Sequence, residues 1–142
     1  MGSTLIRLGE EGLRTSVSVD GHVFHVDEPL AAGGGNTAAH PVQILLGALG
    51  SCMAITARLY AQRKGWPLQG VEIALDVERR RAADYPADAG DASFVHEIRQ
   101  RITLLGPLDD AQRRRIIEIA GRCPVHRIID SPAFFVDADD GA

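Results

Sequence analysis

The sequence contains little cysteine, a single lysine and few aromatic residues. Cys52 and Cys123 are its two cysteines, and Lys64 is the one lysine among 15 basic residues. Two cysteines are too few for the disulfide framework of a small secreted protein. With a formal net charge of −4, the chain lacks the basic excess that nucleic acids and acidic membranes attract. We therefore expect neither a nucleic acid nor a membrane as a partner.

No charged segment followed by an apolar one opens the chain, so we do not expect it to be directed to secretion. We expect a cytoplasmic protein, in which the two thiols stay reduced and serve either as core side chains or as a redox pair. The length of 142 residues, 45% of them hydrophobic, suits a single domain over residues 1–142 with a substantial core.

What the chain does have is a long uncharged stretch, residues 40–56, which contains Cys52. Pro41 suits a first helical turn and Gly65 suits a stop, so the stretch predicts a helix over Pro41–Lys64. The stretch is apolar almost all the way round, and such a helix must be wrapped by protein. It is shorter than the roughly 20 apolar residues of a membrane span, so we expect a buried core helix.

The remaining patterns predict strands and two shorter helices. β-prone runs and a tight-turn signal at Asp20-Gly21 predict a three-stranded meander before the central helix. The three glycines at 33–35 are typical of a flexible loop. Gly121 is expected to close a helix in the left-handed conformation. The predicted strands are 5–8, 13–19, 22–26, 71–77, 94–104 and 133–136, and the predicted helices begin at Asp109, as N-cap, and at Cys123-Pro124.

This order of elements predicts an α+β fold with antiparallel sheets. Two small sheets from one chain of this length cannot cover a central helix that is apolar on all sides. We therefore expect an intertwined homodimer, in which the sheets of both subunits wrap the two long central helices.

Three polar residues near the predicted core allow more than one interpretation. His96 and Gln100 fall in the inward phase of the strand at 94–104, where they line a pocket, form hydrogen bonds in the core or lie at an exposed strand end. His126 follows Cys123 by three residues, but two cysteines and scattered histidines do not make a zinc site. We expect neither a metal nor a cofactor.

Two motifs in a fixed order carry a resemblance to a known family. HPVQILLGALGSCMAIT holds Cys52 and LDDAQRRRIIEIAGRCPVHRIID holds Cys123, with DEP and GGG before them and a strand pair between them. These pieces span nearly the whole chain, and they resemble the OsmC and organic hydroperoxide resistance (Ohr) family of thiol peroxidases. The resemblance implies an intertwined α+β homodimer in which Cys52 attacks a peroxide and Cys123 resolves the product.

The residues by themselves favour the opposite roles for the two cysteines. A helix N-terminus favours a thiolate, so Cys123 should ionise more readily than Cys52, whose apolar surroundings disfavour the charged form. The resemblance to the Ohr branch supplies a compensating cation, an arginine from the N-terminal strands.

In that branch a glutamate near the start of the central helix holds the arginine. The matching positions here are Val42 and Gln43, so the carboxylate is missing, although Gln43 can still hydrogen-bond an arginine or a peroxide oxygen. Arg14 is the best arginine candidate, with Arg7 behind it.

Two functions of different class follow. The first is a cysteine peroxidase, an antioxidant enzyme of the oxidative stress response that reduces organic hydroperoxides or hydrogen peroxide. Cys52 becomes a sulfenic acid and then a disulfide with Cys123, which an external dithiol reduces. The second is a non-catalytic module of the same fold that senses redox state or binds a small ligand. The missing helix glutamate keeps the second function open.

Overall fold

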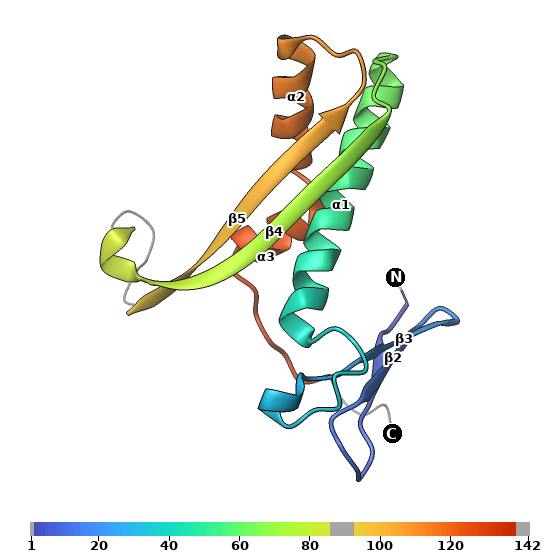
Figure 1. The fold of residues 1–142 in the computed structure, drawn as a ribbon, viewed down its shortest axis with the longest axis vertical. Coiled ribbons are helices and arrows are strands. Elements are labelled where there is room, and N and C mark those ends of the chain that lie inside the picture. The colour runs from blue at the N-terminus through green and yellow to red at the C-terminus, as the bar shows by residue number, and fades with distance from the viewer. Residues whose placement is uncertain (1, 86–92, 139–142) are drawn as a thin grey trace. The chain divides into compact units, whose positions relative to one another are not determined.

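The computed structural model describes residues 2–85 and 93–138 of the chain. They form two compact units, Met1–Ala48 and Leu49–Ala142, which are described in turn. The predicted α+β class with antiparallel sheets is confirmed, with one sheet of three strands and one of two (Figure 1).

The N-terminal unit is built on a three-stranded antiparallel meander. Its strands are β1 (Leu5–Arg7), β2 (Thr15–Val19) and β3 (His22–Val26), with β2 in the middle. Asp20 and Gly21 join β2 to β3 with φ of 48° and 82°. Both residues thus have the positive φ that a type I′ turn requires, so the predicted hairpin turn is confirmed.

The glycine-rich segment after β3 is a loop, as predicted, and it folds back on itself through hydrogen bonds. It begins with a short 3-10 helix, η1 (Leu30–Ala32). The amide of Gly34 then donates to the Pro29 carbonyl at 3.1 Å, and Asn36 donates to the Glu28 carbonyl at 2.9 Å. A Cβ at Gly34 would lie 2.0 Å from the Glu28 carbonyl oxygen, so only glycine fits this turn.

The central helix, α1, spans Pro41–Lys64 with the predicted bounds. His40 caps it. The His40 amide donates to Gln43 Oε1 at 3.1 Å, while the Gln43 amide donates to His40 Nδ1 at 3.3 Å. This reciprocal pair is a capping box with histidine in the place usually taken by serine or threonine. Gly65, with φ of 69°, ends the helix.

By length and composition alone, α1 is long and apolar enough to cross a membrane, so the expectation that it is too short does not hold for the whole helix. A core helix passes the same test. Leu49, Met53 and Ala57 lie on one face of α1 and are at most 3% exposed. That face packs into the core of its own unit, but most of α1 is not buried in the single chain, which therefore lacks the predicted enclosure of the helix on all sides.

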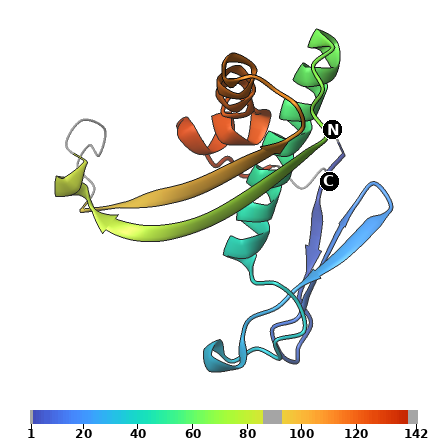
Figure 2. The ribbon, with the colours of Figure 1, turned by 45° about the horizontal axis from the view of Figure 1, so that its top comes forward.

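The core of the second unit lies against a long antiparallel hairpin. Its strands are β4 (Gly70–Arg81) and β5 (Phe94–Leu105), which twist beside α2 (Asp110–Ala120) and α3 (Pro124–Asp130), as Figure 2 shows. The register pairs Ile73 with Ile102, so apolar side chains of both strands share the inner face. The fully or nearly buried members of the core are Leu49, Met53, Ala57, Tyr60, Ala61, Leu68, Leu104, Leu108, Ile116, Ala120 and Cys123.

The predicted starts of α2 and α3 are confirmed. Asp109 caps α2 by accepting a hydrogen bond from the Gln112 amide at 2.7 Å, and the Gln112 side chain completes the capping box. Cys123 is the N-cap of α3, and Pro124 occupies its first turn. The expectation for Gly121 is wrong, because its φ of −68° continues the right-handed conformation.

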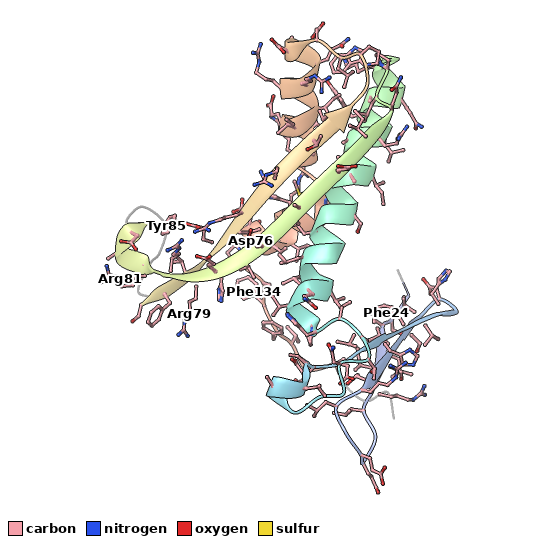
Figure 3. All side chains as sticks on the ribbon, viewed as in Figure 1. Phe24, Asp76, Arg79, Arg81, Tyr85 and Phe134 are labelled. Atoms are coloured by element: carbon pink, nitrogen blue, oxygen red, sulfur yellow. The ribbon has the colours of Figure 1, made fainter. Side chains whose placement is uncertain are left out.

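Two other expectations also differ from the structure. The predicted strand at 71–77 is longer in the structure, because β4 continues through Arg81 and ends in a 3-10 turn, η2 (Ala82–Asp84). Arg79 and Arg81 therefore project from a strand (Figure 3), and the Arg79 guanidinium lies 4.6 Å from the centre of the Phe94 ring. The segment 133–136 is exposed and forms no strand, because none of the described strands pairs with it. The segment 86–92, between η2 and β5, and the tail at 139–142 lie outside the described residues.

Candidate functional site

The structure brings the two cysteines into contact. Cys52 lies in the middle of α1 and is half-buried, whereas Cys123 caps α3 and is fully buried. The two thiols are free, and Cys52 packs against the core cluster that contains Cys123 and contributes to the raised pKa of the Cys123 thiol. Two residues that are far apart in the sequence thus form one dithiol, in which one sulfur is partly open to solvent and the other is enclosed.

Local packing explains why Cys123 is held in this place. Ile116 and Ala120 of α2 are 0% and 1% exposed, so the end of the helix that leads to Cys123 is packed in the core. The Cys123 amide donates to the Ala120 carbonyl at 3.3 Å, and Cys123 Sγ accepts a hydrogen bond from the His126 amide at 3.3 Å. The thiol is therefore fixed by backbone on both sides.

Burial raises the pKa of the Cys123 thiol above its ordinary value. The amides of His126 and Val125 act in the opposite direction, but the loss of solvent around the sulfur is the larger effect, and Cys52 adds to it. The expectation that its position at a helix N-terminus lowers the pKa of Cys123 is therefore wrong. The physical reason is that α3 is a short helix whose N-cap lies inside the core.

The small residues before Cys52 allow β4 to lie close to α1. A Cβ at Gly50 would be 3.3 Å from the Leu75 Cδ1 atom, whereas a Cβ at Gly47 would meet nothing within 4 Å. Gly50 is thus the glycine that permits close packing of the strand on the helix. This contact sets the depth of Cys52 against the sheet.

A cavity of about 340 Å³ lies next to the dithiol in the same unit. His126 connects the two, because its amide donates to Cys123 Sγ and the residue is part of the cavity lining. His96 and Gln100 both line this cavity, which confirms the predicted pocket, but both are exposed residues of β5, so the alternative of hydrogen bonds in the core is wrong. Its complete lining is Leu49, His96, Ile98, Gln100, His126, Ile129 and Asp130.

Arg14 belongs to the N-terminal unit, where Thr37 holds it. Its Nη1 donates to Thr37 Oγ1 at 2.7 Å, and the Thr37 hydroxyl donates to Asp27 Oδ2 at 2.6 Å. Asp27 is 2% exposed, which makes it the buried charged residue of the described chain. Sequence reasoning missed Asp27 and Thr37, although an aspartate before a proline and three glycines is a signal for a loop built around a carboxylate.

Gln43 and Val42 also lie in the N-terminal unit. The acceptor oxygen of Gln43 is used in the cap of α1, which leaves its amide group as a donor. Val42 is 46% exposed. The structure thus groups Cys52 with Cys123 in one unit and Arg14 with Thr37 and Asp27 in the other. In the described parts of the chain, no three His, Cys, Asp or Glu side chains gather as metal ligands do.

Comparison with known proteins decides the family. The model of the OsmC-like protein family matches residues 33–136, which include both cysteines. The chain belongs to the OsmC-like protein family. A search of curated proteins found no match.

Solved structures share the OsmC-like fold. The chain is 24% identical to a protein from Psychrobacter arcticus named for osmotic stress induction and detoxification response, with a TM-score of 0.68 over 90% of this chain and 88% of that one. An organic hydroperoxide resistance protein OsmC from Legionella pneumophila is 18% identical, with a TM-score of 0.64 over 89% of this chain and 88% of that one. The organic hydroperoxide resistance protein OhrB of Bacillus subtilis is 19% identical, with a TM-score of 0.59 over 89% of each chain. These likenesses show that the fold extends over almost the whole chain.

Proposed function

We propose that this OsmC-like protein is a cysteine peroxidase that reduces organic hydroperoxides or hydrogen peroxide. The observation that carries the proposal is the contact between a half-buried thiol, Cys52, and a fully buried thiol, Cys123. Free cysteines are usually inert core residues, but two that touch across distant segments can exchange electrons as a pair. Family membership and the likeness to proteins named for hydroperoxide resistance support the same chemistry.

The reaction starts at Cys52. Its thiolate attacks one peroxide oxygen, so that a sulfur–oxygen bond forms, the O–O bond breaks and the alcohol leaves with a proton. The resulting sulfenic acid is then attacked by Cys123, which forms the disulfide and releases water. An external dithiol reduces the disulfide by thiol–disulfide exchange and restores both thiols.

Exposure and ionisation support this order of events. A peroxide and a reductant must reach the reacting sulfur, and Cys52 keeps part of its surface open whereas Cys123 is 0% exposed. The raised pKa of Cys123 favours the thiol form, which makes it a poor first nucleophile. Cys123 is better suited to the second step, because its partner sulfur is already in contact.

Arg14 is the proposed cation that stabilises the Cys52 thiolate and the peroxide, and Gln43 contributes its amide donor. Arg14 is preferred to Arg7 because its guanidinium is held in a hydrogen-bonded network. A fixed guanidinium needs less reorganisation when negative charge develops, so it stabilises the transition state more effectively than a free one.

We also propose that the protein functions as a homodimer. Ile55 and Leu59, which share one face of α1, are 59% and 60% exposed, and Ile6 of the N-terminal sheet is 58% exposed. These apolar residues line shallow hollows on their own units. A second copy of the chain is a natural cover for such surfaces, and an obligate interface of this kind buries upward of about 2,000 Å².

Peroxide consumption by the purified protein, with a dithiol as reductant, tests the proposed function. We expect turnover with an organic hydroperoxide, and a Cys52–Cys123 disulfide in peptides from protein treated with peroxide alone. The matched control is the double variant Cys52→Ser/Ser16→Cys. It keeps the number of thiols unchanged but moves one of them to the other unit. Wild-type protein that neither consumes peroxide nor forms the disulfide contradicts the proposal.

The alternative function is a redox-sensing or small-ligand-binding module, and the cavity beside Cys123 favours it. The cavity is lined by four polar side chains and is large enough for a small molecule. Disulfide formation without catalytic turnover identifies a sensor. A ligand that binds equally well to the Cys52→Ser variant identifies a binding module.

A further inference from the structure

Asp27 is a buried carboxylate that the protein keeps charged. It accepts four hydrogen bonds, from the amides of Glu28, Gly35 and Thr37 and from the Thr37 hydroxyl. These bonds, with that of the Thr37 hydroxyl the largest, lower its pKa from 3.8 to about 2. A buried charge is costly unless it is fully hydrogen-bonded, and the folded glycine loop supplies those donors.

The directions of the hydrogen bonds at Thr37 follow from the chemistry of its neighbours. A hydroxyl has one proton to donate, a guanidinium can only donate, and an ionised carboxylate can only accept. Thr37 must therefore accept from Arg14 at 2.7 Å and donate to Asp27 at 2.6 Å. The polarised hydroxyl makes the Arg14 bond stronger than one to an isolated threonine, because linked hydrogen bonds reinforce one another.

The network leaves part of the guanidinium available. Both hydrogen bonds that Arg14 makes to described residues use Nη1, at 2.7 Å to Thr37 Oγ1 and 3.5 Å to the Thr37 carbonyl. The Nε and Nη2 donors remain for another acceptor, such as a thiolate or a peroxide oxygen. One edge of the guanidinium is thus anchored, and the other can meet a reactant.

We propose that Asp27, acting through the Thr37 hydroxyl, is the positioning residue for Arg14 and takes the place of the carboxylate that α1 lacks at Val42 and Gln43. The inference rests on the proposed role of Arg14 in peroxide reduction. Asp27 acts by restricting the guanidinium to one orientation. A helix glutamate is therefore unnecessary in this chain.

The test uses Thr37→Val, which keeps the shape of the side chain and removes the bridging oxygen. The readout is the rate of alkylation of Cys52 by iodoacetamide as a function of pH, in a Cys123→Ser background. We expect the profile of Thr37→Val to move to higher pH, with about tenfold slower alkylation on its acidic side, as for loss of a hydrogen bond to a charged group. Thr37→Ser, which keeps the hydroxyl, should restore the original profile.

Arg14→Ala and the double variant Arg14→Ala/Thr37→Val complete a mutant cycle. If Thr37 acts through Arg14, its substitution should have no further effect once Arg14 is gone. Asp27→Asn should move the profile in the same direction as Thr37→Val, and Thr103→Val, an exposed threonine on β5, is the matched control with an unchanged profile. Circular dichroism of each variant establishes that it is folded.

Two results overturn the inference, and they differ in what they say of the proposed function. If Arg14→Ala slows alkylation but Thr37→Val does not, the arginine acts without the anchor and only the inference fails. If neither variant changes the profile while the wild-type protein still reduces peroxide, Arg14 is not the cation of the site. Loss of peroxide reduction in the wild type is a separate failure, which the turnover assay detects.

Discussion

The N-terminal unit is organised around one buried carboxylate, whereas the Leu49–Ala142 unit is organised around an apolar core. In the described part of the first unit, Val17 and Val26 are the buried apolar residues, and Asp27 ties the loop together through hydrogen bonds. In the second unit, helix and sheet residues enclose Cys123 completely. Polar anchoring holds a cation in the first unit, and apolar packing holds a dithiol in the second.

This difference matters for chemistry because the two kinds of groups need different surroundings. A resolving thiol is best enclosed, where its only accessible partner is the neighbouring sulfur. A cation that must meet an incoming peroxide is better held by hydrogen bonds on one edge and left open on the other. The substitutions below separate these two contributions, from the largest expected effect to the smallest.

The largest effect should come from the dithiol itself. Cys52→Ser should abolish peroxide reduction, because the first nucleophile is lost. Cys123→Ser should allow one turnover and leave a sulfenic acid on Cys52 that a dimedone-type probe traps. Single-turnover kinetics and mass spectrometry measure both. The reverse pattern would assign the first attack to Cys123.

The association of subunits should depend on the apolar face of α1. Ile55→Asp places a charge where the proposed interface excludes water, and such a change costs several kcal/mol. We expect a dimer for the wild type and a monomer for Ile55→Asp in light scattering at micromolar concentration. Glu72→Gln, an exposed change on β4, is the matched control. A wild type that is monomeric at this concentration would end the dimer proposal.

Truncation of the core should affect stability much more than truncation of the exposed sheet. Met53 is 0% exposed, and Met53→Ala should lower the free energy of unfolding by about 2 to 5 kcal/mol, since a cavity remains. Val23 on β3 is 62% exposed, and Val23→Ala should change the free energy of unfolding by less than about 0.5 kcal/mol. Urea denaturation measures both. Similar losses would mean that the sheet is covered in solution.

The stability of the two units should fall at opposite ends of the pH scale, at low pH in the N-terminal unit and at high pH in the Leu49–Ala142 unit. Because the pKa of Asp27 is lowered in the fold, its contribution to stability is complete above its ordinary value of 3.8 and is lost as pH falls toward about 2. Asp27→Asn should therefore flatten the acid limb of the stability curve. Hydrogen exchange of the Gly35 and Thr37 amides measures this loss of stability in the N-terminal unit.

The alkaline counterpart lies in the other unit. Because the pKa of Cys123 is raised by burial, its contribution is complete below the ordinary thiol value of 9.0 and is lost as pH rises through the raised folded value. Cys123→Ser should be less sensitive to pH in this range. Thermal unfolding under reducing conditions, compared with the wild type, measures the difference. An unchanged alkaline limb would contradict the burial of the thiol.

The smallest effect should come from returning a carboxylate to α1. Val42→Glu should accelerate peroxide reduction only slightly, because Thr37 and Asp27 already hold Arg14. In the Thr37→Val background the same change should recover more of the lost rate. Initial rates with an organic hydroperoxide test both backgrounds. A large acceleration by Val42→Glu alone would show that the network is a poor substitute for a helix glutamate.

Local patterns in the sequence are sufficient to predict most elements. Pro41 and Gly65 define α1, Asp20-Gly21 defines the hairpin turn, and Asp109 defines the start of α2, because each acts through its own φ or its own capping bond. Such preferences depend on neighbours within a few residues, so they can be predicted without the fold. The two cysteine motifs, by their residues and their order along the chain, likewise indicate the family.

The tertiary structure decided what burial does to each group. Cys123 stands at a helix N-terminus, yet its pKa is raised because distant core residues remove solvent from the sulfur. The glycines at 33–35 fold back on the chain, where Asp27 and Glu28 lie against them. Thr37 links Arg14 to Asp27 only once the loop has folded back. Solvent exclusion and hydrogen bonds between residues far apart in the chain are properties of the packed molecule, so no local pattern contains them.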